Sequence, residues 1–122
     1  MDRSRIRIAQ LGEDLPIVEA PYAVLIDADD NDWGDVSHIR AVGNRLLEAG
    51  CRYFVCFGRR SEAVHDYLDD LLVEGEWPLV ITTFHDDETK EDVVNFFVNC
   101  ATIDMNGALV LVGCISDWET YF

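Results

Sequence analysis

Short apolar runs alternate with amphipathic segments along the chain. Four of these runs end at turn-forming or charged residues and predict buried strands. They span Ala23–Ile26, Tyr53–Phe57, Leu79–Phe84 and Ala108–Cys114. Arg5–Leu11 alternates more weakly and is a candidate for an additional edge strand. The segments between the apolar runs repeat their apolar residues every three to four positions, which is the spacing of one helix face.

Three helices are therefore expected between the strands. Asp35 or Ser37 can cap the first helix and Gly50 can end it, while Thr89 and Asp92 resemble a capping box for the third. The second helix is expected to begin at Ser61. The expected core-facing residues are Ile39, Val42, Gly43, Leu46 and Leu47 in the first, Val64, Tyr67, Leu68, Leu71 and Leu72 in the second, and Val93, Val94, Phe96, Phe97, Val98 and Ala101 in the third.

The order β-α-β-α-β-α-β with short connections predicts an α/β fold. Such alternation favours a parallel sheet covered by helices that are joined to it by right-handed crossovers. We expect one domain over residues 1–122, a three-layer, Rossmann-like sandwich with a mostly parallel sheet of four to five strands. Residues 1–21 would supply the extra edge strand and a loop, and residues 115–122 a short aromatic tail.

Negative charge dominates the composition. The chain has 24 Asp and Glu against 9 Lys and Arg, a formal net charge of −15 over 122 residues. After Arg60 there is one basic residue, Lys90, against fourteen acidic ones. Such a surface repels nucleic-acid phosphates and anionic membranes and attracts basic proteins or cations. The sequence therefore predicts neither a nucleic-acid partner nor a membrane partner.

Other sequence features point to a cytoplasmic protein without a cofactor. No apolar stretch reaches the ~18–20 residues of a membrane span, and the N-terminal residues lack the apolar region of a secretory signal. The four cysteines, Cys51, Cys56, Cys100 and Cys114, form no CxxC pair, and no Cys/His spacing suits zinc. No glycine-rich phosphate loop is present.

Carboxylates gather where the predicted strands end. Ligands of open α/β sheets bind at the carboxyl ends of the strands, and oxygen-rich sites suit Mg²⁺. Asp27, Asp86 and Asp117 follow three different strands and are the candidate metal ligands. The alternative is that these acids cap helices or are solvated, because acidic side chains are favoured at helix N-termini.

The string VLIDAD, Val24–Asp29, resembles the first motif of haloacid-dehalogenase-type phosphatases. The resemblance implies that Asp27 is the nucleophile and Asp29 the acid/base, with Mg²⁺ as cofactor. The segment LVGCISD is similar to the family's last acidic motif, but Cys114 stands where the family has a metal-binding Asp. The first strand with IDADDN also resembles NYN/PIN-type nucleases, which gather carboxylates around Mg²⁺. A Mg-dependent phosphohydrolase or nuclease centred on Asp27 is therefore the alternative function.

The leading prediction is a non-catalytic, acidic protein-binding domain. Its physical type is that of bacterial immunity proteins and antitoxins, small cytoplasmic proteins that neutralise a basic toxin. The one-sided charge would steer a basic partner to it at a high rate. The predicted contact residues are Asp66, Asp69, Asp70, Glu74, Glu76, Asp86, Asp87 and Glu88, with Trp77 as the central anchor. A homodimer formed through the third helix or the aromatic tail is a further possibility.

Overall fold

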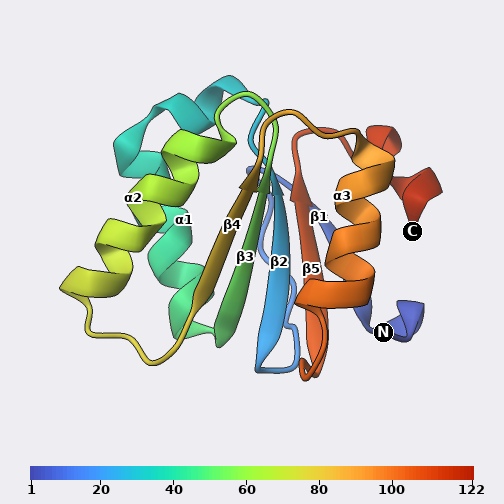
Figure 1. Ribbon diagram of the computed structural model, residues 1–122, viewed down its shortest axis with the longest axis horizontal. Coiled ribbons are helices and arrows are strands. Elements are labelled where there is room, and N and C mark those ends of the chain that lie inside the picture. The colour runs from blue at the N-terminus through green and yellow to red at the C-terminus, as the bar shows by residue number, and fades with distance from the viewer.

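The structure, a computed structural model, describes residues 1–122 and confirms the predicted Rossmann-like α/β fold (Figure 1). Five strands form one all-parallel sheet in the order β1-β5-β2-β3-β4. The strands are β1 (Ile6–Gln10), β2 (Tyr22–Asp27), β3 (Cys51–Phe57), β4 (Ile81–His85) and β5 (Gly107–Val112). The weakly alternating N-terminal segment is thus an edge strand, as predicted, and it pairs with β5.

Helices cover both faces of this sheet and make a three-layer sandwich. Helices α1 (Val36–Glu48) and α2 (Ser61–Glu74) lie on one face, and α3 (Lys90–Phe96) lies on the other (Figure 1). Two apolar clusters fill the spaces between the layers, one on each face. Every residue of β5 is buried, which explains why its sequence is a continuous apolar run rather than an alternating one.

Local capping agrees with the sequence pattern at two of the three helices. The Asp35 carboxylate accepts a hydrogen bond from the Ser37 N–H at the start of α1, and Thr89 Oγ1 accepts one from the Asp92 N–H at the start of α3. Helix α2 begins after Arg60 without a capping side chain. A π-helical turn, Phe97–Ala101, extends α3. None of the helices is long and apolar enough to pass through a membrane.

All five strands differ from the sequence prediction by one or two residues at one or both ends. Strand β4 begins at Ile81 rather than at Leu79, which lies in the preceding loop with 85% of its surface exposed. Strand β5 ends at Val112, so Cys114 is exposed rather than part of the strand. Hydropathy does not distinguish an apolar residue that pairs in a sheet from one that lies beside it, because pairing depends on the partner strand.

Candidate functional site

The order of the strands places a crevice between β2 and β5. The chain runs outward from β2 to β4 through α1 and α2 and returns to β5 through α3 on the opposite face. The strand order therefore reverses between β2 and β5, and open α/β sheets bind ligands at the carboxyl ends of the strands beside such a reversal. Asp27, the last residue of β2, lies at this point.

Trp118, from the C-terminal tail, packs beside Asp27 at this end of the sheet. Its side chain is fully buried, and its Nε1–H donates a 2.8 Å hydrogen bond to Asp27 Oδ2. The indole meets the Phe57 ring edge to face, with 5.2 Å between ring centroids, and the Lys90 ammonium lies 5.0 Å from the indole centroid. The aromatic tail thus packs against the carboxyl ends of β2 and β3.

Asp27 and Asp29 each also accept a hydrogen bond from a backbone N–H group. Asp27 Oδ1 accepts from the Asp29 N–H at 3.1 Å, and Asp29 Oδ1 accepts from the Arg59 N–H at 2.8 Å. No group of three or more His, Cys, Asp or Glu side chains is placed so as to hold a metal ion. The structure therefore does not bring Asp27, Asp86 and Asp117 together into one cluster. Asp27 and Asp29 lie close together, and both carboxylates accept hydrogen bonds from backbone N–H groups.

The predicted partner-binding acids lie on α2 and in the loops that follow α2 and β4. Asp66, Asp69, Asp70 and Glu74 lie on α2, and Glu76 follows that helix. Asp86, Asp87 and Glu88 follow the opposite end of β4. All are exposed except the half-buried Asp69. Glu74 faces α1, where its carboxylate pairs with the Arg40 guanidinium at 3.3 Å.

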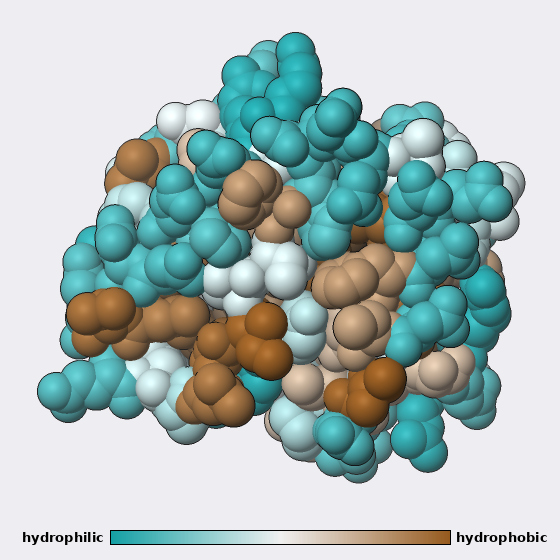
Figure 2. All heavy atoms as spheres, viewed as in Figure 1, coloured by the Kyte–Doolittle hydropathy of each residue, from teal (hydrophilic) through white to brown (hydrophobic).

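Exposed apolar side chains lie near these acids, and the sequence analysis did not single them out. The exposed fractions are 80% for Val73, 85% for Leu79, 42% for Ile81 and 38% for Phe84. Figure 2 shows apolar surface gathered in the lower middle of this view, with hydrophilic surface around it. We use the name β4 face for strand β4 together with Val73, Leu79 and the eight predicted partner-binding acids. The segment Leu79–Phe84 contains more apolar side chains than an edge strand can bury. This excess was the sequence signal for exposed apolar surface here.

Trp77, the predicted central anchor, follows α2 and packs partly within the fold. Its side chain is half-buried and packs against the larger apolar cluster, and the Arg52 guanidinium lies 5.6 Å from its ring centroid. Much of the indole surface is thus already used within the fold. Leu79 and Ile81 are more exposed than Trp77.

Two histidines connect β4 to nearby carboxylates. His65 Nδ1 lies 2.9 Å from Asp66 Oδ1, and the His65 ring packs 5.0 Å from Phe84. His85 Nδ1 lies 3.0 Å from Glu88 Oε1, and its Nε2 lies 3.0 Å from Thr83 Oγ1.

Glu88, His85 and Thr83 thus form a row of carboxylate, imidazole and hydroxyl groups. Such a row can activate the hydroxyl as a nucleophile. The structure has three cavities, and none is lined by Thr83, His85 or Glu88, so no pocket presents a substrate to the row.

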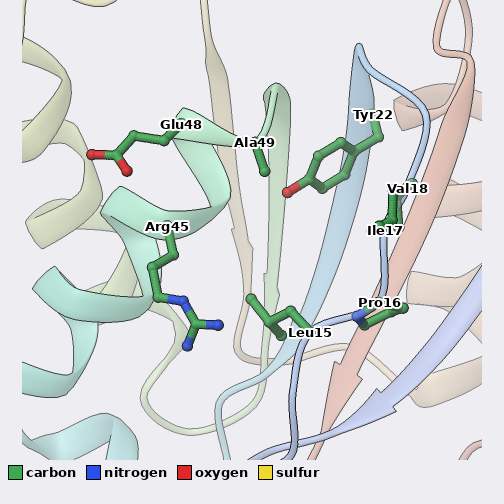
Figure 3. Close-up of a pocket in the computed structure, with 8 residues that line it drawn as sticks. All are labelled: Leu15, Pro16, Ile17, Val18, Tyr22, Arg45, Glu48 and Ala49. Atoms are coloured by element: carbon green, nitrogen blue, oxygen red, sulfur yellow. The ribbon is translucent and has the colours of Figure 1, made fainter.

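The largest cavity, about 460 Å³, lies at the opposite end of the sheet. It is an open hollow between the loop before β2 and the end of α1, lined mostly by aliphatic side chains (Figure 3). Tyr22, at the start of β2, points toward α1, and its hydroxyl donates a 3.1 Å hydrogen bond to the Leu46 carbonyl. Burial raises the pKa of Tyr22 above its ordinary value. The phenol is thus neutral at physiological pH and serves packing.

Fold and surface define the class of this protein: a small Rossmann-like α/β protein with an acidic surface and a partly apolar sheet edge. The chain belongs to the family described as "Domain of unknown function (DUF7684)", whose model matches residues 5–118. No curated protein and no solved structure matches the chain. The matched segment contains all five strands and all three helices.

Proposed function

We propose that this chain is a cytoplasmic, acidic protein-binding domain of the immunity-protein or antitoxin kind that binds a basic protein through its β4 face. The observation that carries the proposal is the apolar centre of that face, Val73, Leu79, Ile81 and Phe84, with acids on both sides. Protein interfaces commonly combine an apolar centre with a polar rim. The free thiols of all four cysteines suit a reducing compartment.

Charge supports a basic partner over a neutral or acidic one. The net charge of −15 creates a long-range field, and after Arg60 only Lys90 offsets the acids. Complementary charge raises association rates and disfavours partners of like charge. The apolar centre would then hold the partner once charge has brought it near, since burying apolar surface contributes ~25 cal/mol per Å².

The proposal is tested by capture from the native host at low salt with three forms of the protein. The face variant carries Asp70→Lys, Glu76→Lys and Asp87→Lys, at exposed residues of the β4 face that make no ion pair. The matched control reverses an equal number of exposed acids elsewhere, at Glu13, Asp14 and Glu48.

We expect the wild type and the control to retain the same basic protein, and the face variant to lose it. The purified partner should bind the face variant at least about tenfold more weakly than the control. Capture of no specific basic protein, or equal binding by both variants, would contradict the proposal.

A further inference from the structure

We propose that the β4 edge takes up an extended, basic segment of the partner as a sixth strand of the sheet. This inference rests on the proposed function and adds its mode of binding. Extended peptides join exposed sheet edges through main-chain hydrogen bonds, and pockets for alternate side chains give the specificity. Four properties of β4 support it: free backbone groups, an unguarded sequence, two distinct side-chain faces and acidic surroundings.

The free backbone groups of β4 belong to Thr82 and Phe84. The Gly58 N–H donates a 3.1 Å hydrogen bond to the His85 carbonyl, so the His85 backbone faces β3. Backbone groups alternate along a strand, which turns those of Ile81 and Thr83 toward β3 as well. The N–H and C=O groups of Thr82 and Phe84 therefore point outward, and no other strand pairs with them.

Strand β4 lacks the devices that usually protect a sheet edge. Its sequence, Ile-Thr-Thr-Phe-His, has no Lys, Asp, Glu or Pro, and its register with β3 is continuous from Ile81 to His85. Natural proteins block edges with charged residues, prolines or bulges. The other edge strand, β1, carries Arg7 and follows Arg3 and Arg5. The two edges thus differ, and only β4 is open to pairing.

An added strand would meet different side chains on its two faces. On the α2 side, Thr82 Oγ1 donates a 2.5 Å hydrogen bond to Asp69 Oδ1, and Phe84 packs against His65. Asp66, Asp69 and Val73 follow the three- to four-residue spacing that places side chains along one side of a helix. On the α3 side the sheet presents Ile81. We infer that the bound segment directs Lys or Arg toward α2 and apolar side chains toward Ile81.

Charge selects this occupant over a second copy of the chain. Pairing two β4 edges would bring together two molecules of net charge −15 and two sets of the same carboxylates. Like charges placed opposite each other destabilise a sheet pair, whereas opposite charges stabilise it. A basic extended segment removes that repulsion and retains the main-chain hydrogen bonds. The partner chemistry is thus alternating basic and apolar residues in an extended strand.

The test uses a synthetic peptide with the sequence Lys-Val-Lys-Val-Thr-Val-Lys-Val-Lys, blocked at both ends. Its control peptide has proline in place of every valine, which keeps the charge and removes alternate N–H donors. The protein variants are Thr82→Pro, which removes an outward N–H, and Thr82→Val, which loses the bond to Asp69 but keeps the N–H. Gln10→Pro makes the matched change on the β1 edge.

We expect the valine peptide to bind the wild type, Thr82→Val and Gln10→Pro with similar affinity, and Thr82→Pro at least about tenfold more weakly. Amide exchange at Thr82 and Phe84 should slow when the valine peptide is present and stay unchanged with the proline peptide. Thermal unfolding of each variant checks that it folds. Should Thr82→Pro not fold, the exchange measurement on the wild type decides.

Three results would overturn strand addition. The first is a loss of the expected difference in affinity. Either both peptides bind the wild type equally, or Thr82→Pro and Thr82→Val bind the valine peptide equally. The second is no slowing of exchange at Thr82 and Phe84. The third is self-association that Thr82→Pro abolishes, which would assign the edge to a second copy. If the charge-reversed face variant still loses the native partner, the protein-binding function stands and only the strand mode fails.

Discussion

Trp118 ties the C-terminal tail to the end of β2 through one hydrogen bond and close aromatic packing. A fully buried indole N–H needs an acceptor, because an unpaired polar group inside a protein is costly. Asp27 supplies that acceptor at 2.8 Å. The carboxylate that resembles a catalytic nucleophile in sequence therefore has a structural partner 91 positions away. This contact gives Asp27 a structural role.

Replacing Trp118 by Phe should lower the free energy of unfolding by about 1–3 kcal/mol, because the aromatic packing largely remains while Asp27 loses its donor. Urea unfolding measures this, and a double-mutant cycle with Asp27→Ala should show coupling of about 1 kcal/mol. Trp77→Phe is the control, since Trp77 is half-buried and packs on Arg52. Additive effects of the Trp118 and Asp27 changes would show that the contact does not stabilise the fold.

The four thiols divide into two buried and two exposed groups, with consequences for pH. Burial raises the pKa of Cys51 to about 12 and raises that of Cys56 above its ordinary value. Above pH 9 the unfolded chain loses these thiol protons while the folded protein keeps them, so stability falls as the pH rises. The contribution is fully present below pH 9.

We expect the free energy of unfolding to fall between pH 8 and pH 10 by about 1 kcal/mol for each buried thiol. Urea unfolding at both pH values measures the change, and Cys51→Ala should reduce it. Cys100→Ser is the control because Cys100 is exposed and its substitution should leave the slope unchanged. A slope that Cys51→Ala does not alter would contradict this account of the buried thiols.

The joint between β3 and α2 depends on Gly58. Its φ of +104° lies in the left-handed region, and a Cβ there would approach Asp29 Oδ1 to 2.6 Å. Gly12 also has a positive φ, +92°, but its Cβ would have no neighbour within 4 Å. Substituting Gly12 therefore measures the free-energy cost of a positive φ alone, and substituting Gly58 adds the cost of a steric clash.

Gly58→Ala should lower the free energy of unfolding by about 2–4 kcal/mol and Gly12→Ala by about 1 kcal/mol, because the first change adds a clash to the backbone strain. Thermal or urea unfolding of both variants measures the difference. Equal losses at the two positions would show that the packing of Gly58 against Asp29 does not matter for this joint.

The local pattern of apolar and polar residues predicts the helices and strands and their order along the chain. Contacts between distant segments determine the strand order in the sheet and the burial of the tail. The helical face Val64, Leu68 and Leu71 is buried as its spacing indicates. Strand order is not readable in the same way, because β1 pairs with β5 across most of the chain. The burial of Trp118 is likewise a contact between distant segments. Its neighbours in sequence gave no indication of it.

The excess of negative charge marks candidate partner-binding acids but not the exposed apolar residues near them. The sequence proposes Asp66, Asp70 and Asp87 from that excess, and the structure places the first two on α2 and the third after β4. The free apolar surface at Leu79 and Ile81 depends on which strand ends the sheet, and composition does not contain that information. The molecule as a whole therefore combines a long-range negative field with a short-range apolar edge.

The association rate of the purified partner at two ionic strengths tests the central claim most directly. Surface charges are screened beyond a Debye length, about 30 Å at 0.01 M salt and about 8 Å at 0.15 M. We predict that added salt slows association of the wild type and of the Glu13, Asp14 and Glu48 control. The β4-face variant should associate at least about tenfold more slowly at low salt and respond less to added salt. Equal rates and equal salt responses for both variants would show that the β4 face does not guide a basic partner.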